Sequence, residues 1–216
     1  MLIVQKFGGS SIADGDRLRR AAGICMRQRQ NGNEVVVVVS AMGDTTDLLA
    51  DRARVLGGKP SPREMDALIT TGEQQSAALL VMTMESLGIP AVSLAGWQAG
   101  IYTDCRYGDS DIRLIAPMRI REALSRGKVP VVTGFQGVCA AGDITSLGRG
   151  GSDTTAVALA AALESDCCEI YTDVDGIYTA DPRLIQEAVK LNAIDYRDML
   201  ALAEAGSQVL HAKSVE

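Results

Sequence analysis

Two kinds of hydrophobic pattern alternate along the chain and predict its elements. Short, continuous apolar runs indicate strands that are buried on both faces, as strands of a parallel sheet are. Val35–Val39 is the clearest run, because five consecutive β-branched residues favour an extended conformation. The predicted strands are residues 2–5, 34–40, 91–94, 129–133 and 168–172.

Longer stretches between these runs predict helices. Asp14 is a suitable N-cap for a helix that runs to about Gln30, and Gly32 follows its end. The other predicted helices are residues 45–56, one that begins at Pro62, and residues 73–87, 117–126, 152–163 and 195–205. Residues 97–111 are less regular and fit either a hairpin or a surface insertion. The alternation predicts an α/β fold with an open, mostly parallel sheet and helices on both faces.

Composition narrows the class of protein. The chain has 216 residues, 47% of them hydrophobic, which suits one large domain or two lobes that share one sheet. A net charge of −6 and only 4% aromatic residues argue against a nucleic-acid partner. No apolar run reaches transmembrane length, and residues 1–6 lack the features of a signal peptide. We therefore expect a cytoplasmic protein without a membrane partner.

The cysteines and the histidine add expectations about redox state and metals. The five cysteines are an odd number and are scattered, apart from Cys167 and Cys168, so we expect free thiols. The chain has one histidine, His211, and no Cys-x-x-Cys motif, so we expect no dedicated zinc site.

The first chemical motif is Lys-Phe-Gly-Gly-Ser-Ser at residues 6–11, directly after the first predicted strand. Glycines let the backbone approach a ligand, and successive free amides form an anion nest. Lys6 adds a positive charge, and the two serine hydroxyls add donors, so the motif suits phosphate oxygens. A tight turn with a surface lysine is the alternative. The motif is neither a Walker A loop nor the Rossmann fingerprint.

The second motif is a glycine turn at the start of a helix, over residues 148–155. A helix N-terminus offers unpaired amides and a partial positive charge to an anion. Ser152 and Asp153 are also good capping residues, which is the alternative explanation for both. Arg149 lies between glycines, and its planar guanidinium is suited to holding a carboxylate.

A third segment, residues 171–183, follows a strand and contains three aspartates, two tyrosines and an arginine. A loop rich in turns is the alternative. These three segments, together with Thr71-Gly72-Glu73, resemble the amino-acid kinase family and, within it, the aspartate kinases. The four motifs occur in the family's order, and the resemblance covers essentially the whole chain.

The resemblance implies an enzyme that moves the γ-phosphoryl of ATP to the β-carboxylate of L-aspartate, giving 4-phospho-L-aspartate for lysine, threonine and methionine biosynthesis. ATP and Mg²⁺ would be required, with no protein metal site, because Mg²⁺ would be held mainly through ATP. A homodimer is implied. The residues before about 150 would form an N-terminal lobe for aspartate, and those after it a C-terminal lobe for ATP.

The resemblance also implies a role for each matching residue. Lys6 and Asp153 would be the catalytic pair. The residues that would bind aspartate are Ser40, Thr46, Glu73, Arg149 and Ser152. The residues that would bind the nucleotide are Lys6, Gly8, Gly9, Ser10, Thr172, Asp173, Tyr178, Arg183 and Lys213.

Elementary chemistry agrees with these roles. A substrate carboxylate with a pKa near 4 is already ionised at neutral pH, so no general base is needed. An anion that attacks a polyanion needs positioning and electrostatic relief. Glu73 is a reasonable partner for the amino group of aspartate, although an acidic residue also suits a first helical turn.

The chain departs from the family at its C-terminal end. Ala212 stands where the family commonly has proline, and regulatory ACT domains, which often follow the kinase domain, are not expected here. Two other functions remain open. One is a sister kinase that acts on glutamate, acetylglutamate or a nucleotide. The other is a regulatory or ligand-binding subunit without turnover, although Lys6, Arg149 and Asp153 are all present.

Overall fold

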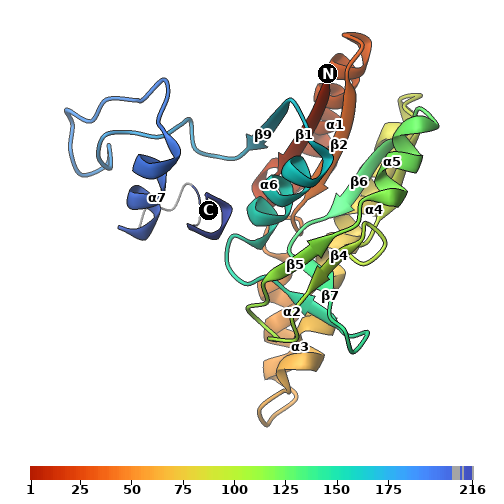
Figure 1. The fold of residues 1–216 in the computed structure, drawn as a ribbon. Coiled ribbons are helices and arrows are strands. Elements are labelled where there is room, and N and C mark those ends of the chain that lie inside the picture. Colours follow the sequence, from red (N-terminus) through yellow and green to blue (C-terminus); the bar gives the residue numbers. More distant parts are fainter. Residues whose placement is uncertain (206–209, 211, 216) are drawn as a thin grey trace.

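A five-stranded parallel sheet forms the centre of the computed structural model, which describes residues 1–205, 210 and 212–215 (Figure 1). The strand order is β3-β6-β2-β1-β9, and every neighbouring pair is parallel. The strands are β1 (Leu2–Phe7), β2 (Glu34–Val39), β3 (Ala91–Leu94), β6 (Val129–Thr133) and β9 (Cys167–Tyr171). All five strand predictions and the predicted parallel sheet are confirmed.

Helices cover both faces of this sheet. Helices α1 (Gly15–Gln30) and α4 (Thr71–Ser86) pack on one face, and α5 (Met118–Ser125) and α6 (Gly151–Leu163) pack on the other. The remaining helices are α2 (Thr45–Arg54), α3 (Pro62–Ile69) and α7 (Tyr196–Glu204). Asp14 caps α1 as predicted, accepting a hydrogen bond from the amide of Arg17 at 2.8 Å. The segment between β9 and α7 extends away from the sheet (Figure 1).

The valine run of β2 explains how one strand supports two hydrophobic layers. Successive side chains of a strand point to opposite faces. Val35, Val37 and Val39 pack with side chains of α1 and α4. Val36 and Val38 pack with side chains of α5 and α6 on the other face. A run without polar interruptions is therefore what a central strand between two helical layers requires.

A second, four-stranded sheet has the order β5-β4-β7-β8 and was not predicted as a sheet. Its strands are β4 (Ile101–Thr103), β5 (Ile112–Ile115), β7 (Gln136–Val138) and β8 (Ile144–Ser146). Strand β4 pairs antiparallel with β5 and forms a hairpin, of which the first strand lies within residues 97–111 and the second lies just beyond them. Each strand has only three or four residues, too few for a period-two pattern to stand out.

The expectation of free thiols is wrong for two of the five cysteines. Cys105 and Cys139 form a disulfide between residues 34 positions apart, with their Cα atoms 5.2 Å from each other. Cys25, Cys167 and Cys168 are free, as expected. The second sheet brings Cys105 and Cys139 together, and a count of cysteines cannot show such a pairing.

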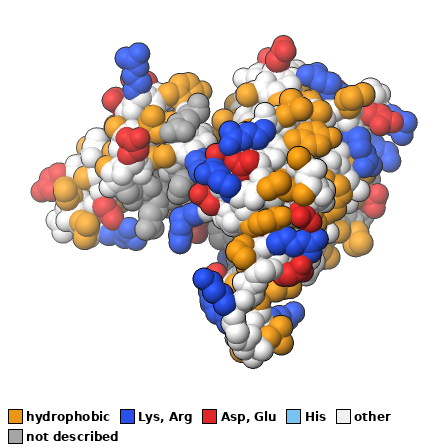
Figure 2. Space-filling view, turned by 60° about the horizontal axis from the view of Figure 1, so that its bottom comes forward, with side chains coloured by type: hydrophobic (Ala, Val, Ile, Leu, Met, Phe, Trp, Pro, Cys, Tyr) orange, Lys and Arg blue, Asp and Glu red, His pale blue; other side chains and the backbone are white. Residues whose placement is uncertain are grey.

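Two surface observations bear on the expected partners. On the face in Figure 2, lysines and arginines are interspersed with aspartates and glutamates rather than gathered into one basic surface. Across the described part of the chain, we find no helix with the length and apolar character that crossing a membrane would require. His211 lies outside the described residues.

Candidate active site

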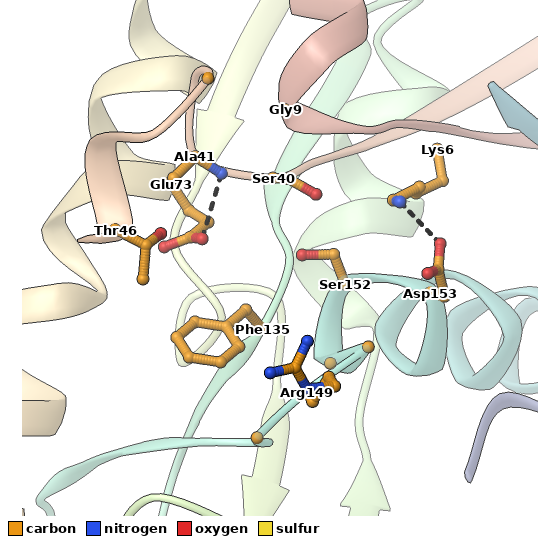
Figure 3. Close-up of a pocket in the computed structure, with 14 residues that line it drawn as sticks. Lys6, Gly9, Ser40, Ala41, Thr46, Glu73, Phe135, Arg149, Ser152 and Asp153 are labelled. Carbon is orange, nitrogen blue, oxygen red and sulfur yellow. Dashed lines mark hydrogen bonds and ion pairs between the residues drawn. The ribbon is translucent and has the colours of Figure 1, made fainter. Parts of the chain in front are cut away.

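A cavity of about 270 Å³ opens where the chain leaves the carboxyl ends of β1 and β2 and enters α6 (Figure 3). The carboxyl edge of a parallel sheet is the usual place for a ligand in an open α/β fold. The lining residues are Lys6, Gly9, Ser40, Ala41, Gly43, Thr46, Glu73, Phe135, Gly148, Arg149, Gly150, Gly151, Ser152 and Asp153. Eight of these fourteen were candidate site residues from the sequence.

Lys6 and Asp153 form an ion pair in this cavity, with Nζ 2.7 Å from Oδ1. Lys6 is near the end of strand β1, and Asp153 is in the first turn of α6. Both side chains are largely withdrawn from solvent, with 9% and 16% of their surface exposed. A close pair in such surroundings fixes the ammonium group in one place, where it can meet a negatively charged ligand.

Glycine is required at two positions around the cavity. A Cβ on Gly9 would lie 2.5 Å from the carbonyl oxygen of Ala41, so only glycine allows these two loops to approach each other. Gly150 is the N-cap of α6 in a left-handed conformation (φ 72°). No side chain caps this helix, so Ser152 and Asp153 do not cap it and lie inside its first turn.

Glu73 and Arg149 face the cavity from opposite sides (Figure 3). Glu73 is only 3% exposed, and its Oε1 accepts a hydrogen bond from the amide of Ala41 at 3.1 Å. Its Oε2 has no hydrogen-bond partner among the described residues. Burial raises the pKa of Glu73 to about 7, against the opposing effect of its backbone hydrogen bonds. Arg149 forms no ion pair with any described residue.

Three hydroxyl side chains complete the set of residues predicted to bind aspartate. Ser40 follows β2, Thr46 is in the first turn of α2, and Ser152 is in the first turn of α6. All three line the cavity, so all five residues predicted to bind aspartate lie around the same cavity. Such an arrangement has donors for anionic oxygens and one carboxylate for a cation.

Phe135 is a cavity residue that the sequence did not indicate. In Figure 3 its ring lies below Glu73 and beside Arg149. Its backbone has a φ of 69°, which is uncommon for a residue with a bulky side chain. Its amide donates to Thr155 Oγ1 at 3.1 Å, and its carbonyl accepts from the amide of Leu147. The only signal was its place between two glycine-containing turns at the end of a predicted strand.

Only some of the residues predicted to bind the nucleotide lie in or beside this cavity. Lys6 and Gly9 line the cavity, and the amide of Gly8 bonds to the carbonyl of Tyr171 at 3.0 Å beside it. Ser10, Thr172 and Asp173 line a neighbouring cavity between α1 and the end of β9. Both cavities border the same glycine turn.

The other three predicted nucleotide residues have partners of their own. Tyr178 donates a hydrogen bond to Asp175 at 2.9 Å. Arg183 is exposed and pairs with Asp181 at 2.8 Å. Lys213 pairs with Asp109 and Asp111 at 2.5 and 3.3 Å. Their contact with a nucleotide remains a prediction.

Fold and site together define an α/β protein with a cavity at the carboxyl edge of a parallel sheet, lined by a lysine, an arginine and a buried carboxylate. Comparison with known proteins makes this specific. The chain belongs to the amino acid kinase family, whose sequence model matches residues 1–216.

The chain is similar to proteins named aspartokinase. It is 54% identical to the one from Mycolicibacterium smegmatis, covering 100% of this chain and 51% of that protein. It is 53% identical to the one from Geobacillus stearothermophilus, with 100% and 53% covered. The chain thus spans about half the length of the curated relatives it matches.

The chain is also similar to solved structures of aspartate kinases. The aspartate kinase of Synechocystis superposes with a TM-score of 0.87 at 49% identity, covering 100% of this chain and 35% of that one. Aspartokinase III of E. coli, solved with aspartate and ADP, superposes with a TM-score of 0.90 at 28% identity, with 100% and 59% covered.

Proposed function

We propose that this chain forms the catalytic part of an aspartate kinase, which moves the γ-phosphoryl of ATP to the β-carboxylate of L-aspartate and forms 4-phospho-L-aspartate. One observation carries this proposal. The buried carboxylate of Glu73 has an unpaired oxygen in the cavity that Arg149 also faces. A carboxylate and a guanidinium across one small cavity match the amino group and the α-carboxylate of an amino acid. The complex of E. coli aspartokinase III with aspartate and ADP supports this choice of ligands.

The acceptor would be held at its non-reacting end. Arg149 would bind the α-carboxylate with two parallel N–H···O bonds, and Glu73 would bind the ammonium group. The hydroxyls of Ser40, Thr46 and Ser152 would donate to the remaining oxygens. With that end fixed, the β-carboxylate is left to meet the phosphoryl group beside Lys6 and the N-terminus of α6.

The transfer forms a bond between a β-carboxylate oxygen and the γ-phosphorus, and it breaks the bond between that phosphorus and the bridging oxygen of ADP. The carboxylate is ionised at neutral pH, so no proton has to be removed. Lys6 would neutralise charge that develops on the phosphoryl oxygens, and Asp153, 2.7 Å away, would hold the ammonium in place. The backbone amides of the glycine turns would add further donors.

For the nucleotide, we propose binding along the glycine turn at Gly8, Gly9 and Ser10 and past Thr172 and Asp173. Tyr178, Arg183 and Lys213 remain predicted contacts in a lobe from about residue 150 onward. The described residues contain no group of three or more side chains that would hold a metal ion. Mg²⁺ would be held mainly by phosphate oxygens of ATP, where it would neutralise phosphate charge. A cytoplasmic homodimer remains a prediction from the family.

The test measures ADP release in a coupled assay with MgATP and L-aspartate, beside glutamate, acetylglutamate and UMP as parallel acceptors, and traps the acyl phosphate of carboxylate acceptors with hydroxylamine. We expect aspartate-dependent hydroxamate that disappears in Lys6→Ala. Turnover with another acceptor alone would make the chain a sister kinase. Aspartate binding without any turnover would favour a regulatory or ligand-binding subunit.

A further inference from the structure

Asp66 is a buried carboxylate that lies outside the cavity. It is the one fully buried residue of α3 and is only 1% exposed. Its Oδ2 accepts hydrogen bonds from the amides of Gly108 and Ser146, both at 2.9 Å. Its Oδ1 accepts from the hydroxyl of Ser146 at 2.7 Å. Among the described residues, no lysine or arginine forms an ion pair with Asp66, and these three hydrogen bonds hold its carboxylate.

The first segment held by Asp66 leads directly to Arg149. Ser146 is the last residue of β8, three positions before Arg149. The carbonyl of Ser146 accepts from the amide of Ser110 at 2.9 Å, and Ser146 pairs with Gln136 across the second sheet. Asp66 therefore fastens the point from which the chain turns through Gly148 into the cavity.

The second segment held by Asp66 supports the same turn from behind. Gly108 donates to Asp66, and its carbonyl oxygen would lie 3.3 Å from a Cβ on Gly148. Asp109 packs closer still, with Oδ1 2.7 Å from that Cβ position. Movement of Gly108 and Asp109 would thus displace the backbone immediately before Arg149.

The third connection runs along the helices to Glu73. Asp66 is in α3, and α4 begins at Thr71, one residue after the C-cap of α3, so Glu73 follows two turns later along the chain. The corner between the two helices is fixed to the second sheet, because Gln136 Nε2 donates to the carbonyl of Thr70 at 2.8 Å. Asp66 is therefore joined to the helix that carries Glu73 and to the loop that carries Arg149.

We propose that Asp66 is a positioning residue of the acceptor site, which sets the separation between Glu73 and Arg149 without touching the substrate. The assignment of aspartate as the acceptor rests on the proposed function, whereas the mechanical link does not. An error of about 1 Å in placing one of two clamping groups costs a large part of the binding energy. Loss of Asp66 would leave three buried donors unsatisfied and would loosen the turn.

The test compares two substitutions that differ in hydrogen bonding. In Asp66→Asn, the side-chain oxygen still accepts from both amides, and its NH₂ group can donate to the hydroxyl of Ser146. Asp66→Ala removes all three bonds, and Ser146→Ala removes one. We expect Asp66→Ala to raise KM for aspartate by about tenfold or more, Ser146→Ala by less, and Asp66→Asn hardly at all. KM for ATP and kcat should stay within about twofold, since binding of aspartate is weakened equally in the ground state and the transition state.

Asp143→Ala is the matched control. Asp143 also joins α3 to the loop of residues 104–111, because it accepts from Arg63 at 2.8 Å and from Tyr107 at 2.8 Å, but this pairing lies at the surface. It should leave KM for aspartate unchanged. An Asp66→Ala enzyme with an unchanged KM for aspartate, or with equal increases for both substrates, would overturn the proposal. If Asp66→Ala does not fold, an unchanged KM in Ser146→Ala would overturn it.

A measurement without turnover separates this proposal from the proposed function. Amide hydrogen exchange of the full chain should speed up in Asp66→Ala and Ser146→Ala over residues 144–151, and it should not do so in Asp143→Ala. If this pattern appears while the wild-type protein uses another acceptor, the proposed function fails and the positioning role remains. If exchange there is the same in all variants, the positioning role fails even in an active aspartate kinase.

Discussion

The ammonium of Lys6, on strand β1, and the carboxylate of Asp153, on helix α6, lie 2.7 Å apart. A strand end and a helix N-terminus are both rigid, so neither partner depends on a mobile loop for its position. The pair therefore holds a positive charge at a fixed point in a cavity that also contains the Arg149 guanidinium.

Removal of this charge is the first prediction. Lys6→Ala should lower kcat by about 10²-fold or more, because a preorganised charge next to the transferring group is lost. The decrease should appear in initial rates of ADP release with saturating aspartate and ATP. Lys59→Ala, which removes an exposed lysine on the surface, is the control and should be as active as the wild type. Equal activity in the two variants would remove Lys6 from the mechanism.

The second prediction concerns pH and acceptor binding. Glu73 must be ionised to bind an ammonium group, and burial raises its pKa to about 7 in the free protein. We therefore expect kcat/KM for aspartate to rise with pH and to level off above about pH 7. In Glu73→Gln, kcat/KM for aspartate should be low and should no longer increase with pH. A wild-type profile that is flat between pH 5.5 and 8.5 would contradict the role of Glu73.

The third prediction concerns pH and stability, again through Glu73. Its pKa is about 7 when folded and near the ordinary value of 4.5 when unfolded. Between these values the folded state binds more protons, so the free energy of unfolding should fall as pH rises from 4.5 to 7. Glu73→Gln should remove that part of the slope and be the more stable protein at pH 8. Urea unfolding of both proteins at several pH values measures the difference.

The fourth prediction concerns the disulfide of Cys105 and Cys139. The bond closes a loop across 34 positions, and its removal should cost about 2–4 kcal/mol of stability. Thermal unfolding of the wild type should shift to lower temperature with a thiol reductant, whereas Cys139→Ser should start at the lower temperature and be insensitive to the reductant. Cys167→Ser, which replaces an exposed free thiol, should still respond to the reductant as the wild type does.

The central sheet could be predicted from the sequence because its strands have a strong, local signature. The five valines of β2 had to be extended and buried on both faces, and they are. The second sheet could not be predicted, because its short strands are defined by pairing between distant segments. The disulfide escaped prediction for the same reason, since Cys105 and Cys139 meet only after that sheet forms.

The residues of the candidate site also differ in how clearly the sequence indicated them. Lys6, Glu73, Arg149 and Asp153 lie in the motifs that the sequence analysis identified, and they share one cavity. Phe135 has no such signal, because an apolar residue after a strand is usually part of the core. Tyr178, Arg183 and Lys213 were indicated only by resemblance, and their contacts in the structure are with nearby aspartates.

The most direct measurement compares L-aspartate with succinate, which lacks the amino group, and with β-alanine, which lacks the α-carboxylate. Steady-state rates with MgATP would be measured for each acceptor in the wild type and in Glu73→Gln. We expect the wild type to use aspartate much faster than either analogue. In Glu73→Gln, the difference in rate between aspartate and succinate should become smaller, while the difference between aspartate and β-alanine should remain. Equal rates with all three acceptors in the wild type would contradict an acceptor held between Glu73 and Arg149. So would a difference in rate between aspartate and succinate that is the same in Glu73→Gln as in the wild type.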